Sequence, residues 1–207
     1  MKNKTLYIFS LVVVLLLADQ ALKLWVKTNF MLGEELNVAG NWFILHFTEN
    51  NGMAFGIELA GAYGKLMLTL FRILVVGGIV WYLFTLIREK AHSGLITSVM
   101  LVVAGALGNI IDSVFYGVWF EYAGYFHGRV VDMFYFPIIE GHFPQWFPLW
   151  GGEDFIFFRP VFNLADTYIS AGVISIFVFQ KRFFSNLTDS TPVALPDCKQ
   201  DSVDNIQ

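Results

Sequence analysis

The segment GLITSVMLVVAGALGNIIDSVF, residues 94–115, is an apolar run that holds Asn109 and Asp112 near its end. A helix needs about 20 apolar residues to cross the hydrocarbon core of a bilayer, so this run is long enough to span a membrane. A charged side chain at mid-bilayer costs at least about 2.5–3.5 kcal/mol, so an acid in such a segment is a functional candidate by default. The segment therefore predicts a membrane helix that carries chemistry.

Three further runs are long enough to span a membrane, and they are Thr5–Trp25, Leu66–Ile87 and Asn163–Phe184. Hydrophobic residues make up 56% of the chain and charged residues only 14%, whereas about a quarter of the residues of a soluble domain are charged. Both observations predict a mainly α membrane protein with four transmembrane helices. They place residues 1–184 in one four-span membrane domain.

The composition also argues against several classes of function. A net charge of -4 does not favour a nucleic-acid partner. The one cysteine, Cys198, cannot form an internal disulfide, and the four histidines show no metal-binding spacing. We expect no metal and no cofactor.

The first run has the basic start of a signal peptide, because Lys2 and Lys4 precede the apolar residues Leu6–Ala18. No clean A-x-A cleavage site follows, and the sequence continues into Asp19 instead. We interpret the run as an uncleaved first helix, with a cleaved signal peptide as the alternative.

Basic residues predict the orientation of the chain in the membrane. They cluster at the start of the first run, between the second and third runs, and after the fourth, as Lys2, Lys4, Arg88, Lys90, Lys181 and Arg182. With four spans these clusters share one side, and the positive-inside rule makes that side cytoplasmic. We therefore expect a multi-pass membrane protein with both termini in the cytoplasm.

The two segments expected outside, Val26–Lys65 and Tyr116–Phe162, are not plain linkers. Asn41–Thr48 is aromatic and β-branched between turn residues, which predicts a short strand. We expect a small extracytoplasmic β-rich element between helices 1 and 2, and an extended loop between helices 3 and 4. Residues 185–207 are polar and are expected to form a disordered cytoplasmic tail.

Polar groups at the outer ends of the spans are the candidates for a site. Asp19 and Lys23 are four residues apart, so they can pair on one helical face; a self-neutralising anchor at the membrane surface is the alternative. Arg72 is explained by a side chain that reaches the outer surface, and we assign it no chemistry.

Small residues in the third run favour a close helix contact. Ala104, Gly105 and Gly108 provide small-xxx-small spacing, which would turn Asn109 and Asp112 toward the bundle. Hydrogen bonding between helices would be their simplest role.

Three more polar residues stand close to the fourth run. Asp132 lies in the apolar stretch Val130–Ile139, which favours a buried loop position over a solvated one. Asn163 and Asp166 open the fourth run, where a helix cap and a favourable dipole contact would suffice to explain them. Together with Asp19 and Asp112, these acids fall at one depth, the outer edge of the bilayer.

At this point the chain resembles a known family, lipoprotein signal peptidase (signal peptidase II), from the first run through the fourth. Each motif alone is weak, but five in the family's order are specific: Asp19-Gln20-x-x-Lys23, Asn50-x-Gly52-x-Ala54-Phe55-Gly56, Gly105-x-x-Gly108-Asn109-x-x-Asp112, Val130-Val131-Asp132 and Phe162-Asn163-x-Ala165-Asp166.

The resemblance implies an aspartic endopeptidase of the bacterial cytoplasmic (inner) membrane, whose partners are membrane lipid and diacylglyceryl-modified prolipoproteins. Such an enzyme cuts on the amino side of the lipidated cysteine and releases the signal peptide. By the same resemblance, Asp132 and Asp166 are the catalytic pair, and the site lies near the extracytoplasmic face. Further matching positions would bind substrate or shape the site (Asn50, Gly52, Asn109, Asn163) or support it (Asp19, Lys23, Asp112).

The chain departs from the family pattern in two places. Ser113 stands where the family usually has arginine, and the interval before Val130 is longer than usual. We hypothesise that Arg129, just before the Val-Val-Asp motif, supplies the missing guanidinium.

Two neighbouring carboxyl groups suit amide hydrolysis, because they share one proton and can serve as base and acid together. A proton- or cation-coupled transporter is the main alternative, since intramembrane acids also relay ions. A non-enzymatic scaffold is the second. We expect a monomer.

Overall fold

The computed structural model describes residues 2–52, 61–137, 139–142, 154–157 and 161–184. Four helices form the main bundle: α1 (Lys2–Asn29), α2 (Gly61–Arg88), α3 (Ser93–Ile111) and α5 (Leu164–Val178). Helix α3 continues through a π-helical turn, η2 (Asp112–Tyr116), into the short α4 (Gly117–Trp119), and α6 (Gln180–Phe183) follows α5.

Among the described residues, three helices are long and apolar enough to cross a membrane: Thr5–Asn29, Tyr63–Arg88 and Ser93–Trp119. The fourth, α5, is equally apolar in character but shorter, with 15 residues. The predicted class, a mainly helical membrane protein, is confirmed.

A small antiparallel sheet accompanies the helices. Its strands, in the order β1-β2-β3-β6, are β1 (Glu35–Ala39), β2 (Phe43–Asn50), β3 (Val130–Tyr135) and β6 (Val161–Phe162). A separate hairpin consists of β4 (Ile139–His142) and β5 (Asp154–Phe157).

The strand expected at residues 41–48 is confirmed as β2, but two other expectations are corrected. The sheet does not come only from the segment between α1 and α2, because β3 and β6 belong to the segment between α3 and α5. Asp132 therefore lies on a strand and not in a loop. The run Val130–Tyr135 is rich in β-branched and aromatic residues, and it can hydrogen bond to β2 on one edge and β6 on the other.

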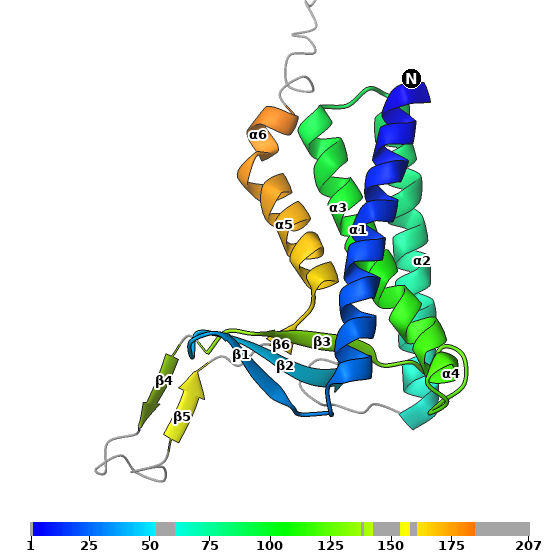
Figure 1. Cartoon of the computed structure of the whole chain (residues 1–207). Coiled ribbons are helices and arrows are strands. Elements are labelled where there is room, and N and C mark those ends of the chain that lie inside the picture. Colours follow the sequence, from blue (N-terminus) through cyan, green and yellow to red (C-terminus); the bar gives the residue numbers. More distant parts are fainter. Residues whose placement is uncertain (1, 53–60, 138, 143–153, 158–160, 185–207) are drawn as a thin grey trace, which may run out of the picture.

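The sheet lies across one end of the helical bundle (Figure 1). The N-terminus, the turn between α2 and α3, and α6 all lie at the opposite end. The sheet end of the bundle is also where α3 passes into η2 and where α5 begins. Residues from distant parts of the sequence therefore converge at this end.

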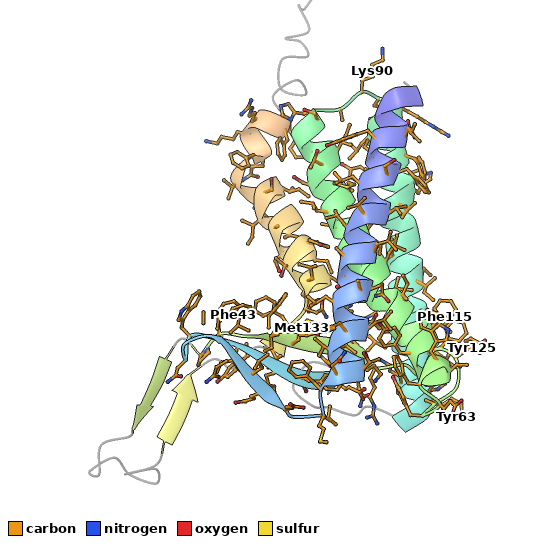
Figure 2. All side chains as sticks on the ribbon, viewed as in Figure 1. Phe43, Tyr63, Lys90, Phe115, Tyr125 and Met133 are labelled. Carbon is orange, nitrogen blue, oxygen red and sulfur yellow. The ribbon has the colours of Figure 1, made fainter. Side chains whose placement is uncertain are left out.

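Apolar side chains fill the bundle and also cover its outside. Leu95, Val99 and Met100 are buried in a cluster between the helices, and Val131 and Met133 of β3 are buried between sheet and bundle (Figure 2). Large apolar side chains such as Trp81, which is 72% exposed, remain on the helix surfaces. Exposed apolar area on this scale fits helices solvated by lipid.

Helix α3 approaches α5 closely because glycine leaves out a side chain at the contact. A Cβ on Gly105 would stand 2.2 Å from the carbonyl oxygen of Ala165, and one on Gly172 would stand 2.5 Å from that of Ser98. The predicted close contact through small residues is confirmed, with α5 as the partner helix.

We predict that Gly105→Ala destabilises the protein by about 1–3 kcal/mol, since the new methyl group would force the backbones of α3 and α5 apart. Gly77→Ala is the matched control, because a Cβ there meets nothing within 4 Å. Thermal unfolding in detergent measures both. Equal melting temperatures for the two variants would contradict the close packing of α3 on α5.

Candidate active site

A buried ion cluster joins α1 to the end of α3. The ammonium of Lys23 lies 3.0 Å from a carboxylate oxygen of Asp19 and 2.8 Å from one of Asp112. All three side chains are at most 1% exposed. The predicted pairing of Asp19 with Lys23 is confirmed, but full burial excludes the alternative of a surface anchor. Gln20 completes the cluster by donating to Asp112 at 2.9 Å.

Each carboxylate of this cluster also accepts a backbone N–H beside a predicted catalytic residue. Asp19 Oδ1 accepts the N–H of Ala165 at 2.9 Å, one residue before Asp166. Asp112 Oδ2 accepts the N–H of Val131 at 3.4 Å, one residue before Asp132. The cluster therefore holds the start of α5 and the middle of β3 in place relative to each other.

Two asparagines connect the ion cluster to the aspartates. Asn109 Oδ1 accepts from Lys23 at 2.9 Å, and its Nδ2 donates to Asp166 Oδ1 at 2.8 Å. Asn163 Nδ2 donates to Asp132 Oδ1 at 2.6 Å and to Asn109 Oδ1 at 3.3 Å. These bonds bring Asp132 and Asp166 into one network.

Asn163 is at the same time the N-cap of α5. Its Oδ1 accepts the N–H of Asp166 at 2.9 Å, and the Asp166 carboxylate accepts the N–H of Asn163 at 3.4 Å, which forms a capping box. The cap expected from the sequence is confirmed. Because one side chain caps the helix and binds Asp132, the helix start is fixed against β3.

Asp132 is 3% exposed, whereas Asp166 is partly exposed. Burial, followed by the charge of Asp166, raises the pKa of Asp132 to about 7, against the hydrogen bond from Asn163. An acid with this pKa is partly protonated near neutral pH. The values belong to the interacting pair and not to one residue.

The turn after β2 approaches the pair from the sheet. The Asn50 side chain hydrogen bonds to Asp132, and Asn50 Oδ1 accepts the N–H of Gly52 at 2.7 Å. Gly52 has a φ of +78°, which glycine adopts without strain. The rest of the second motif, Ala54-Phe55-Gly56, lies outside the described residues, as does the tail from residue 185.

Arg72, for which we predicted no chemical role from the sequence, lies at the site. Its Nη2 donates to the carbonyl oxygen of Gly52 at 3.0 Å, and its charge interacts with Asp132 and Asp166. From the sequence alone, the Arg72 side chain could extend to the outer surface of the membrane or point into a site on the inner face of α2. No signal in the sequence separates the two.

Arg129 contacts residues other than the two aspartates. Its guanidinium is 3.2 Å from Glu49 and lies over the ring of Tyr122, 5.6 Å from the ring centre. Glu49 also pairs with Lys27 of α1. Among the contacts of the described residues, the charge of Arg72 acts on both aspartates, whereas Arg129 pairs with Glu49. Ser113 is fully buried, and its hydroxyl has no hydrogen-bond partner among the described residues.

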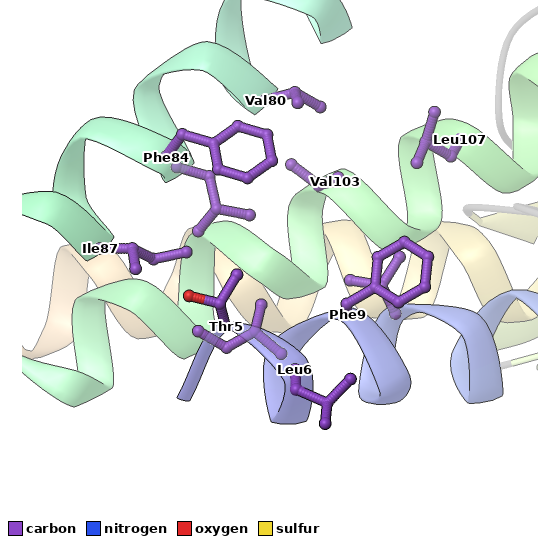
Figure 3. A pocket seen from close by; sticks show the side chains of 11 residues that line it. Thr5, Leu6, Phe9, Val80, Phe84, Ile87, Val103 and Leu107 are labelled. Atoms are coloured by element: carbon purple, nitrogen blue, oxygen red, sulfur yellow. The ribbon is translucent and has the colours of Figure 1, made fainter. Parts of the chain in front are cut away.

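An apolar cavity of about 670 Å³ lies between α1, α2 and α3, away from the aspartates (Figure 3). Apart from Thr5, it is lined by aliphatic and phenylalanine side chains such as Phe9, Phe84 and Leu107. Such a lining offers no group for chemistry. In the part of the chain that the structure describes, no three His, Cys, Asp or Glu residues gather as a metal site.

A membrane-helix bundle that brings two aspartates into one hydrogen-bonded network has the arrangement of an aspartic peptidase that works at a membrane. The chain belongs to the signal peptidase II family: the family described as "Signal peptidase (SPase) II" matches residues 11–182. It is thus a peptidase that removes signal peptides from prolipoproteins, and the alternative of a transporter finds no support.

Curated relatives support this assignment. The chain is 47% identical to a lipoprotein signal peptidase of Porphyromonas gingivalis over 209 aligned positions, which cover 93% of this chain and 91% of the relative. It is 39% identical to one of Amoebophilus asiaticus, with 88% and 80% covered.

Solved structures agree with the fold. A bacterial membrane enzyme determined by the in meso method at 2.3 Å resolution matches with a TM-score of 0.61 at 22% identity, covering 90% of this chain and 94% of that one. A second, at 1.9 Å resolution, matches with a TM-score of 0.59 at 24% identity.

We predict that Lys23→Met destabilises the protein by about 3–5 kcal/mol, because it leaves two buried carboxylates without their shared cation. Adding Asp19→Asn and Asp112→Asn to this variant should recover part of the loss. Lys90→Met, at an exposed position of the α2–α3 turn, serves as the control. Thermal unfolding in detergent measures the series; a Lys23→Met protein as stable as the control would contradict the role of the cluster.

Proposed function

We propose that Asp132 and Asp166 catalyse the cleavage, and that the substrate is a diacylglyceryl-modified prolipoprotein cut on the amino side of its lipidated cysteine. The observation that carries the proposal is the network that joins the two aspartates through Asn163 and Asn109. No other pair of acids among the described residues combines this linkage with a partly exposed member.

In this mechanism the pair shares one proton. The ionised carboxylate takes a proton from a water molecule, which attacks the scissile carbonyl carbon. The protonated carboxyl donates to the carbonyl oxygen as the tetrahedral intermediate forms, and a proton then passes to the leaving nitrogen. Asp132 is the more buried partner, which supports it as the resting site of the shared proton.

The surrounding residues have positioning roles in this proposal. Asn109 and Asn163 orient the two carboxyl groups, and Asn50 with Gly52 shapes the sheet side of the site. Asp19, Lys23 and Asp112 support the backbone beside each aspartate. Arg129 acts from further away, by holding Glu49 of β2, one residue before Asn50.

We further propose a four-span topology in the bacterial cytoplasmic (inner) membrane. In it α5, extended by α6, forms the fourth span of the domain 1–184, and 185–207 is a cytoplasmic tail. The basic clusters Arg88, Lys90, Lys181 and Arg182 lie at the bundle end opposite the sheet, which supports a cytoplasmic position for that end. The aspartates would then work near the extracytoplasmic face, where the acyl chains of the substrate can stay in lipid, in a protein that acts as a monomer.

Cleavage of a diacylglyceryl-modified prolipoprotein by purified enzyme tests the catalytic assignment. Asp132→Asn and Asp166→Asn should each lose at least about 10³-fold in rate, because neither can share a proton with its partner. The wild-type rate should fall as the pH rises above about 7, because the pair then loses its shared proton. Glu89→Gln, exposed at the opposite end of the bundle, is the control.

Folding of both aspartate variants is checked by their thermal unfolding in detergent. If a folded Asp132→Asn or Asp166→Asn protein cleaves at the rate of the control, the assignment of the catalytic pair is wrong.

A further inference from the structure

Three residues on one face of α2 hold the segments that surround the aspartates. Lys65 donates to the carbonyl oxygen of Asn51 at 2.8 Å, Thr69 to that of Phe126 at 3.0 Å, and Arg72 to that of Gly52 at 3.0 Å. Their spacing of four and three residues places them on adjacent turns of the helix. Of the three, Arg72 is the one whose charge interacts with both Asp132 and Asp166.

The glycine at position 52 makes room for the Arg72 guanidinium. A Cβ on Gly52 would lie 2.6 Å from Nη2, 2.7 Å from Nη1 and 2.9 Å from Cζ of Arg72. These distances are too short for a real Cβ, so the guanidinium occupies the space that a side chain at position 52 would need, with its two terminal nitrogens nearest. Glycine is therefore favoured at this position for two reasons: it adopts the positive φ of the turn, and it leaves space for the Arg72 guanidinium.

Arg72 can influence the aspartates through this turn. The turn begins at Asn50, whose side chain hydrogen bonds to Asp132. Since Arg72 binds the carbonyl oxygen two residues later, it helps to fix where Asn50 lies. A guanidinium has five N–H donors, and the bond to Gly52 uses one of them.

Arg72 can also influence the aspartates directly through its charge. Lys23 is another cation that acts on Asp132, but its ammonium is already neutralised by Asp19 and Asp112. Arg129 is paired with Glu49. Arg72 differs because, among the described residues, it forms no close ion pair: its hydrogen bond is to the neutral carbonyl of Gly52, and its charge acts on both aspartates.

We propose that Arg72 is a positioning residue of the Asp132–Asp166 pair. Arg72 fixes the position of the Asn50–Gly52 turn and supplies the positive charge that keeps one of the two carboxyl groups ionised at neutral pH. The proposal rests on the proposed function, because it assumes that this pair is catalytic. It assigns a functional role to a cation that lies outside all five family motifs in this sequence.

The sign of the effect follows from electrostatics. A nearby cation stabilises the carboxylate form and lowers both apparent pKa values of the pair. Removing it should move both limbs of the pH–rate profile to higher pH. Among the described residues, the other charged groups near the pair or near Arg72 are Lys23, which is paired with Asp19 and Asp112, and Lys65, and all of them stay in place in such a variant. A residue that only anchored the turn would lower the rate without moving the limbs.

The test is the pH–rate profile for cleavage of a diacylglyceryl-modified prolipoprotein by wild type, Arg72→Gln and Arg72→Lys. For Arg72→Gln we expect both limbs to shift up by roughly 0.5–1 pH unit and the rate at neutral pH to fall at least about tenfold. Arg72→Lys keeps the charge, so its limbs should stay at the wild-type positions while its rate falls. Arg88→Gln is the matched control, because Arg88 is exposed at the far end of the same helix.

Unchanged limbs in a folded Arg72→Gln protein would overturn the proposal, whatever its rate. If Arg72→Gln does not fold, Arg72→Lys decides, because limbs shifted upward despite the retained charge would also overturn it. Active Asp132→Asn or Asp166→Asn proteins in the same assay would instead contradict the proposed function, so the two failures are distinguishable.

Discussion

A buried lysine, Lys23, lies between two buried carboxylates, and the rest of the site depends on this interaction. In lipid no water is available to solvate an unpaired charge, so each member of the cluster needs the others. Asp19 Oδ1, the oxygen not paired with Lys23, accepts the N–H of Ala165 in α5, and Asp112 Oδ2, which also pairs with Lys23, accepts the N–H of Val131 in β3. Three charged side chains thereby fix the relative positions of a helix and a strand that are far apart in sequence.

The two candidate catalytic aspartates differ in environment because one lies on a strand and the other lies in the first turn of a helix. Asp132 lies on an interior strand of the sheet and is buried, whereas Asp166 lies in the first turn of α5, where it is partly exposed. Asn163 spans the two, since it caps the helix and donates to Asp132. A buried carboxyl group and a partly exposed one, linked through the amides of Asn163 and Asn109, are suited to hold a single proton between them.

Sequence reasoning predicted the parts of the site that depend on local spacing. The pairing of Asp19 with Lys23 follows from their separation on a helix, the burial of Asp112 from the nearby glycines, and the cap at Asn163 from its place before an apolar run. It placed Asp132 in a loop although residues 130–135 are rich in β-branched and aromatic residues, because the strands that pair with β3 are distant in the sequence and could not be identified from it. It also gave Arg72 no role, because the sequence does not show which face of α2 turns inward.

The state of the shared proton tests the account most directly. Infrared difference spectra of enzyme labelled at its aspartates can detect a protonated carboxyl group, and comparison with Asp132→Asn and Asp166→Asn assigns it to the pair. The account predicts one protonated carboxyl at pH 6 that belongs to the pair and is lost as the pH rises through about 7. Two fully ionised aspartates at pH 6 would contradict it.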